Sequence, residues 1–306
     1  MNTPSRIENT RGNVTLVSGL KSLQLLTSKV TECHRMSLPL ESPSEGARCG
    51  THRTTNFEGD IVAGEVWADL NRLRCKVYFL VYDDGTCTTD IDRLLLSVDE
   101  YHKYPPANII RYTKKEIDPI FVQKNKQILD MPRGGGYWLW KPYIINETLK
   151  KLQENDILIY LDSKYYFTQN FVPMYQEYMM NNDIFIWKNR PNGNIHYMKQ
   201  LCKMDVVVKY DMYQKVFHEN AIDCWAGFQI LKKTSNTVSM MEDWLDMCCI
   251  YDDITDEPSI LPNQPGFYEH RHDQSLLSIV LHKYNIPLNS LGTDFLQDVR
   301  NPTIHP

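Results

Sequence analysis

Two acidic residues of the sequence occupy places where catalytic or metal-binding groups are often found. The first is Asp162, which follows the short apolar run 156–161, a pattern typical of a buried strand. Open α/β sheets bind ligands at the carboxyl ends of their strands. A carboxylate there is a common ligand for a hard divalent cation such as Mg²⁺ or Mn²⁺. A cap for the following segment is an equally good interpretation of Asp162.

The second acidic residue is Asp273, which lies in the stretch EHRHDQ. His270, His272 and Asp273 place three groups able to bind a metal within four residues. Histidines two positions apart on an extended segment point to opposite sides, so at most one of them shares a ligand with Asp273. Asp273 is also well placed to cap a predicted helix at 275–284. Arg271 offers a planar fork suited to a phosphate.

An anion site is predicted around the glycine triplet 134–136. Glycine tolerates φ > 0 and allows a ligand to approach the backbone closely. Arg133 precedes the triplet, and Lys141 follows it among tryptophan and tyrosine residues. A lysine in such surroundings is partly desolvated, and a buried cation normally has an anionic partner. A diphosphate facing Arg133 and Lys141 would serve, and so would Asp162 as the partner of Lys141.

Two dipeptides at strands are further candidates for ligand binding. Asp83 and Asp84 follow the first predicted strand of the sheet, where two acids bind a metal or a ribose or, more often, form a turn. Ala226 and Gly227 lie in the middle of a later strand. A glycine inside a strand often marks a close approach by backbone or ligand.

The elements that position these residues alternate between strand and helix. Strands are predicted at 76–82, 108–112, 156–161, 183–187 and 223–231. Helices are predicted at 91–96, 117–129, 137–152, 168–180, 237–251 and 275–284, with Thr168 as the N-cap of the fourth. The segment 204–213 fits either a strand or a helix. The segment 252–266 is predicted to be a loop that is long enough to be a lid. The alternation predicts a three-layer α/β/α domain with a mostly parallel central sheet. The glycine-rich element is not a GxGxxG motif after a strand, nor a GxxxxGK[ST] motif. The sequence therefore does not support a Rossmann dinucleotide site or a P-loop.

Composition narrows the range of partners. The chain of 306 residues has a formal charge of −5, which favours neither a nucleic acid nor an anionic membrane. The eight cysteines show no zinc-ligand spacing and are expected to be reduced thiols. The N-terminus lacks the apolar core of a signal peptide, and no stretch has the ~20 apolar residues of a membrane span. We therefore expect a soluble, cytoplasmic protein.

The first part of the chain differs in composition from the remainder. Residues 1–56 are rich in Ser, Thr, Arg and Glu and are interrupted by proline. They are predicted to be a partly disordered extension. Residues 57–306 are predicted to form the α/β domain, with a short helix at 60–73 before its first strand.

The motifs resemble those of a known enzyme family. RGGGYWLWKPYIINETLKKL, DILIYLDS, WAGFQILKKT, EDWL and HRHDQSLLSIVLHKYNI occur in this order. This order is similar to that in a group of nucleotide-diphospho-sugar glycosyltransferases with the GT-A fold. The resemblance covers about residues 76–287. It implies a GT-A-like domain that transfers a sugar from a nucleotide-diphosphate donor to a glycan or another hydroxyl acceptor.

The resemblance also implies roles for single residues. Asp162 stands where GT-A enzymes carry their metal-binding acid, with His270 or His272 completing a Mn²⁺ or Mg²⁺ site. Lys141 is similar in place to a basic residue that contacts the donor. Ala226 and Gly227 resemble the small strand residues under the donor sugar. Asp83 and Asp84 lie where GT-A enzymes usually bind the nucleobase and ribose. Asp273 and Gln274 resemble the acidic motif that faces the reacting sugar. Asp273 would be the general base of an inverting enzyme, whereas in a retaining enzyme Asp273 or Gln274 would lie behind the anomeric carbon.

One departure from the family pattern concerns the metal. The family motif begins with an aspartate and usually ends with a second acidic or small residue. This chain reads Asp162-Ser163-Lys164, so a lysine takes that last place, and a charged lysine cannot bind a metal. Lys164 either points away or supplies part of the metal's charge. A non-catalytic binding module for nucleotide sugars or glycans is therefore the alternative function. A glycoside hydrolase using Asp162 and Asp273 is less favoured, because a hydrolase has no need of a basic glycine-rich turn.

Overall fold

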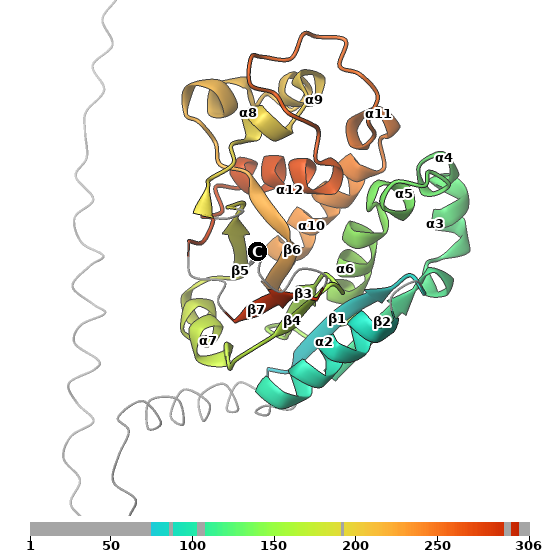
Figure 1. Ribbon diagram of the computed structural model, residues 1–306, viewed down its shortest axis with the longest axis vertical. Helices are drawn as coiled ribbons and strands as arrows, with labels where there is room; N and C mark the ends of the chain where they lie inside the picture. The colour runs from blue at the N-terminus through green and yellow to red at the C-terminus, as the bar shows by residue number, and fades with distance from the viewer. Residues whose placement is uncertain (1–74, 86–87, 103–107, 191–192, 291–294, 300–306) are drawn as a thin grey trace, which may run out of the picture. The chain divides into compact units, whose positions relative to one another are not determined.

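The computed structural model describes residues 75–85, 88–102, 108–190, 193–290 and 295–299 (Figure 1). The predicted extension 1–56 and the predicted helix 60–73 lie outside the described residues.

A five-stranded sheet with the order β2-β1-β3-β6-β5 forms the centre of the domain. Its strands are β1 (Val77–Asp83), β2 (Asn108–Thr113), β3 (Ile157–Leu161), β5 (Ile184–Lys188) and β6 (Cys224–Lys232). The pairs β1–β2 and β1–β3 are parallel. Strand β6 runs antiparallel to both β3 and β5, so β5 has the same direction as the other three strands. The prediction of a mostly parallel sheet is confirmed.

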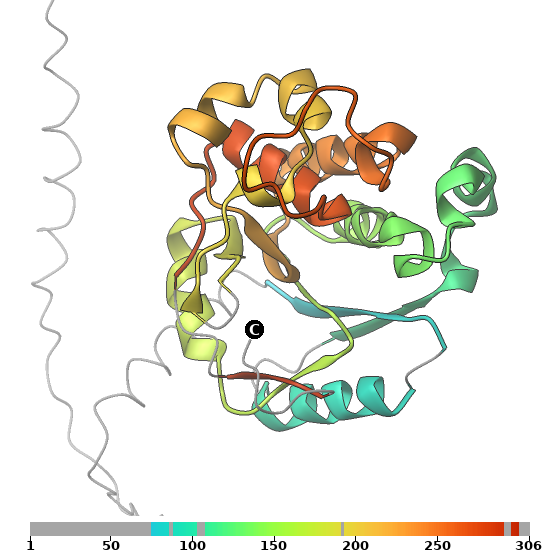
Figure 2. The ribbon, with the colours of Figure 1, turned by 45° about the horizontal axis from the view of Figure 1, so that its top comes forward.

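Helices cover both faces of this sheet (Figure 2). Strand β3 is buried along its whole length, and its side chains alternate between two apolar clusters. Leu158 and Tyr160 join the cluster with α6 (Trp140–Lys151), α10 (Ser235–Cys248) and α12 (His272–Lys283). Ile157, Ile159 and Leu161 join the cluster with α2 (Thr88–Tyr101) and α7 (Val172–Asn181). The three-layer α/β/α architecture therefore follows from one buried strand with two apolar faces.

Shorter elements connect these layers. They are the 3₁₀ turn η1 (Lys114–Glu116), α3 (Pro119–Lys124), α4 (Lys126–Leu129), α5 (Gly134–Tyr137), β4 (Tyr165–Phe167), α8 (Met198–Leu201), α9 (Met204–Lys209), the π-helical turn η3 (Gln214–His218), α11 (Tyr251–Ile254) and β7 (Leu296–Asp298). The short strands β4 and β7 pair antiparallel in a second sheet. The segment predicted as strand or helix at 204–213 begins with the helix α9.

Two predicted helices have different boundaries in the structure. The predicted helix 117–129 is divided into α3 and α4 at Asn125, whose buried side chain bonds back to the Phe121 carbonyl. The predicted N-cap Thr168 is wrong, because β4 occupies 165–167 and α7 begins after Phe171 with a proline in its first turn. That proline is compatible with a helix start but not with a helix interior.

The described cysteines, Cys75, Cys202, Cys224, Cys248 and Cys249, all carry free thiols. Within the described residues, every helix is too short or too polar to cross a membrane.

Candidate active site

A left-handed turn precedes the helix that carries Lys141. Five consecutive residues, Gly134 to Trp138, have positive φ angles of 58°, 60°, 97°, 52° and 61°. Glycine adopts this conformation freely, whereas Tyr137 and Trp138 each cost about 1–2 kcal/mol. The glycine triplet is therefore required by the backbone, and it delays the start of α6 to Trp140 instead of the predicted 137.

Aromatic contacts hold this turn in place. The Trp140 indole N–H donates to the Gly134 carbonyl at 3.0 Å, and its ring stacks on Tyr82 at the end of β1 with 3.9 Å between centroids. The Trp138 ring stacks on His272 at 5.4 Å. These contacts fix the first turn of α6 at the carboxyl ends of β1 and β3, where Lys141 enters the site.

The ammonium of Lys141 lies between two carboxylates. Its Nζ is 3.2 Å from Oδ1 of Asp162, at the end of β3, and 3.2 Å from Oδ2 of Asp273, in the first turn of α12. The side chains of Lys141 and Asp273 are only 5% and 6% exposed, whereas Asp162 is 27% exposed. The structure thus brings together three of the predicted site residues, with Asp162 as the member open to solvent.

Tyr160 completes this centre and was missed by the sequence reasoning. Its hydroxyl donates to Oδ1 of Asp162 at 2.7 Å. The two residues are two positions apart at the end of one strand, so their side chains lie on the same face. The period of the strand was the signal that could have identified it.

Burial and mutual charge shift the pKa values in this centre. Burial alone would lower the pKa of Lys141, but Asp162 and Asp273 outweigh it and raise the pKa above its usual value. Burial raises the pKa of Asp273 to about 6, against the lowering effect of Lys141. Lys141 therefore keeps its charge at neutral pH, while Asp273 changes its protonation just below neutrality.

Gln274 belongs to a neighbouring network around a buried carboxylate, Asp223. The Gln274 amide donates to Asp223 Oδ2 at 2.7 Å and accepts from the Ala226 N–H at 3.3 Å. Asn189 and Ser278 also donate to Asp223. Both ends of the Gln274 amide are thus engaged, and the residue ties α12 to β6. No sequence signal marked Asp223, because its partners come from two distant segments, the end of β5 and α12.

Gly227 lies directly beside Asp162. Its carbonyl accepts the Asp162 N–H at 2.8 Å. A Cβ at position 227 would come within 2.7 Å of the Trp225 ring. The predicted close approach at this glycine is therefore an approach by the backbone of β3 and the ring of Trp225, with Ala226 buried next to it.

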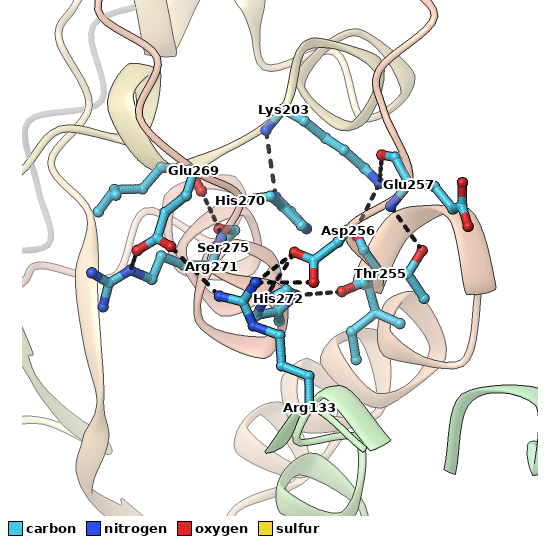
Figure 3. Close-up of polar contacts among 12 residues, drawn as sticks. Arg133, Lys203, Thr255, Asp256, Glu257, Glu269, His270, Arg271, His272 and Ser275 are labelled. Atoms are coloured by element: carbon cyan, nitrogen blue, oxygen red, sulfur yellow. Dashed lines mark hydrogen bonds and ion pairs between the residues drawn. The ribbon is translucent and has the colours of Figure 1, made fainter. Parts of the chain in front are cut away.

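The two histidines lie outside the Lys141 centre, against the segment 253–256 (Figure 3). His270 accepts from the Lys203 N–H at 3.4 Å with Nδ1 and donates to the Asp253 carbonyl at 2.7 Å with Nε2. His272 donates from Nδ1 to the Ile254 carbonyl at 2.7 Å. Burial lowers the pKa of both rings, to about 3 for His270. Both histidines are neutral groups that hold this segment to α12.

Arg133 joins the left-handed turn to the same segment (Figure 3). Its guanidinium contacts both carboxylate oxygens of Asp256, at 3.0 and 2.9 Å, and lies 3.5 Å from Glu269. In the structure Arg133 is therefore paired with protein carboxylates, and its predicted contact with a diphosphate remains a prediction.

Asp83 and Asp84 have different environments at the end of β1. Asp83 is buried, pairs with Arg111, and accepts the Gly85 N–H at 2.8 Å. The Arg111 hydrogen bond lowers the pKa of Asp83. The hydrogen bond from Gly85 to Asp83 is the turn contact that the sequence pattern offered as one interpretation. Asp84 is exposed beside it, and a ribose contact for either residue remains a prediction.

The predicted metal ligands do not come together as a set. Among the described residues, no group of three or more His, Cys, Asp or Glu side chains is arranged to hold a metal ion. The cation found beside Asp162 is Lys141, and Lys164 points instead toward Asp298, with 3.5 Å between Nζ and Oδ2. The residues present at this edge of the sheet therefore do not fit a bound divalent cation.

The fold and the site define an α/β protein with a buried Asp-Lys-Asp centre at the carboxyl edge of its sheet. The sequence matches no protein-family model and no curated protein. Several solved structures of glycosyltransferases are similar to this chain at low identity.

Three of these structures show the level of likeness. The apo form of mouse xyloside xylosyltransferase 1 shares 9% identity and a TM-score of 0.38, with 71% of this chain and 84% of that chain covered. The galactosyltransferase LgtC, in complex with donor and acceptor sugar analogues, shares 10% identity and a TM-score of 0.41, with 74% of this chain and 87% of that chain covered. The glycosyltransferase GlyE of Streptococcus pneumoniae TIGR4 shares 11% identity and a TM-score of 0.38, with 72% of this chain and 46% of that chain covered. All three TM-scores are below 0.5, so the proposals that follow rest on the residues of this chain alone.

Proposed function

We propose that this protein is a glycosyltransferase that uses a nucleotide-diphospho-sugar donor and a hydroxyl acceptor, such as a glycan. The observation that carries the proposal is the buried Lys141 ammonium between Asp162 and Asp273. A buried cation at the carboxyl edge of a sheet suits the anionic leaving group of a diphosphate sugar. The order of the sequence motifs supports the same class of enzyme.

The proposed roles follow from the burial and charge of each group. Asp273 takes the proton of the acceptor hydroxyl as the general base. The acceptor oxygen forms a bond to the anomeric carbon while the bond from that carbon to the phosphate oxygen breaks. The electron pair leaves with the diphosphate, whose charge Lys141 stabilises. Asp162, held by Tyr160, orients Lys141. Gln274 acts through its hydrogen bonds as a positioning residue for α12.

A release assay tests the proposal. The full chain is incubated with a panel of UDP and GDP sugars, with and without oligosaccharide acceptors, and the release of nucleoside diphosphate is measured. We expect Asp273→Asn to lower kcat about 100-fold or more, as for loss of a general base, and Asp162→Ala to abolish transfer. Circular dichroism checks that both variants are folded.

The outcomes separate the two functional classes. Binding of a nucleotide sugar without release, with every donor and acceptor, would favour the non-catalytic binding module. The contacts of Asp162 Oδ1 with both Lys141 and Tyr160 favour that candidate, because they leave this oxygen satisfied within the protein. Hydrolysis of an aryl glycoside without any nucleotide would instead indicate a glycoside hydrolase.

A further inference from the structure

The positive charge beside Asp162 at the carboxyl edge of the sheet is the ammonium of Lys141, a group of the protein itself. We propose that the Lys141 ammonium takes the place of a divalent cation at the donor diphosphate, so that this protein binds and uses its donor without a metal. This inference rests on the proposed function and specifies how the same site neutralises its substrate.

The first step concerns the oxygens that a metal would need. Oδ1 of Asp162 already contacts Lys141 Nζ and the Tyr160 hydroxyl, and Oδ2 of Asp273 faces the same Nζ at 3.2 Å. A charged lysine has donors only and cannot bind a metal. A divalent cation on these oxygens would lie beside an ammonium in a buried site, where like charges repel strongly.

The second step concerns the remaining candidate ligands. Both ring nitrogens of His270 are engaged by backbone groups, and Nδ1 of His272 bonds to the Ile254 carbonyl. Within the described part of the chain, no three or more His, Cys, Asp or Glu side chains are grouped so that they could hold a metal ion. Asp162 alone offers a single carboxylate, so a Mg²⁺ ion bound to it would depend on waters and substrate phosphates for its other ligands.

The third step concerns the capacity of Lys141. An ammonium has three donors, and the two ion pairs use two of them. The partly exposed Asp162 marks the side on which solvent, and hence a phosphate oxygen, reaches the centre. Lys141 lies in the first turn of α6, and the Trp140 contacts with Gly134 and Tyr82 fix that turn. The Lys141 ammonium is therefore held in a fixed position before the donor binds.

Metal binding is tested directly on the full chain. Manganese is titrated into the protein, and free Mn²⁺ is followed by electron paramagnetic resonance, a measurement that needs no activity. We expect no stoichiometric Mn²⁺ binding. Binding of one Mn²⁺ per chain that Asp162→Ala abolishes would overturn the inference.

Donor binding provides the second measurement. UDP, GDP and their sugars are titrated calorimetrically in excess EDTA and in excess Mn²⁺. We expect Kd to agree within about threefold between the two conditions, and Lys141→Met to raise Kd by at least about tenfold in EDTA. Lys141→Arg keeps the charge and should lose less affinity. Lys150→Met, on the same helix and paired with Glu242 at the surface, is the matched control and should leave Kd unchanged.

The results distinguish failure of the inference from failure of the proposed function. Binding or release that requires Mn²⁺ overturns metal independence alone. Absence of both binding and release, in EDTA and in Mn²⁺, overturns the proposed function and the inference with it. Equal donor affinity in Lys141→Met and in the natural protein, with the variant folded by circular dichroism, overturns the role of Lys141.

Discussion

At the scale of single residues, Asp273 is a buried carboxylate whose protonation determines its use as a base. Burial raises its pKa to about 6. The proposed mechanism needs the deprotonated form, so kcat/KM should rise about tenfold per pH unit below 6 and level off above it. The measurement is the pH profile of nucleoside diphosphate release.

A second buried carboxylate tests this assignment. Burial also raises the pKa of Asp223 to about 6, so the profile alone does not identify the base. Asp223→Asn should retain the rise, because the Asp223 carboxylate is engaged within the protein by Asn189, Gln274 and Ser278. Asp273→Asn should remove it, leaving a low and flat profile. A profile that flattens in Asp223→Asn but not in Asp273→Asn would contradict the assigned roles.

Asp223 has a separate effect on stability. Its folded pKa of about 6 is above the usual 3.8, so the folded state binds more protons than the unfolded state between these values. The free energy of unfolding that Asp223 contributes therefore falls as pH rises from about 4 to about 6. An asparagine carbonyl can still accept from Asn189 and Gln274 without a buried charge.

We accordingly expect Asp223→Asn to gain stability relative to the natural protein as pH rises. The gain between pH 4 and pH 7 should be about 1–3 kcal/mol. Urea unfolding of both proteins at the two pH values measures it, and the similar contribution of Asp273 cancels in the comparison. A difference between the two proteins that does not change with pH would contradict the prediction.

At the scale of elements, the left-handed turn before α6 depends on two different properties of glycine. A Cβ on Gly136, at φ +97°, would come within 2.7 Å of the Leu129 Cα. A Cβ on Gly135, at φ +60°, would have only Trp140 Nε1 within 4 Å, at 3.8 Å. Gly135→Ala therefore carries the backbone cost alone, about 1–2 kcal/mol. Gly136→Ala adds a clash with backbone and should cost about 2–4 kcal/mol or more.

Urea unfolding of the two variants measures the difference between them. Equal losses would show that the contact with Leu129 does not limit position 136. Donor affinity should follow stability, because the same turn places Lys141 at the end of β3.

The elements also show which features a sequence can predict. The five strands of the main sheet were predicted to within one residue, because each is a short apolar run bounded by polar residues. The strands β4 and β7 were missed. Each has three residues, and their pairing joins Tyr165–Phe167 to Leu296–Asp298 far along the chain. Such a pairing leaves no periodic signal in either segment.

At the scale of the whole molecule, the same distinction applies to the site. The pairing of Lys141 with Asp162 was among the predicted possibilities, because a buried cation needs an anion. The addition of Asp273 and the engagement of Gln274 by Asp223 depend on how α12 packs against β6. Contacts between distant segments follow from the packing of the layers and are not contained in local spacing.

The Asp-Lys-Asp centre links three elements that meet only in the complete fold: α6, β3 and α12. A ligand that binds this centre binds the folded state alone, and at 100 times its Kd it should stabilise that state by about 2.7 kcal/mol. A nucleoside diphosphate should therefore raise Tm and slow amide hydrogen exchange in all three elements together. Lys141→Met should lose both effects, and Lys150→Met should keep them. Slowed exchange confined to α6 would show that the ligand binds the turn without engaging Asp162 and Asp273.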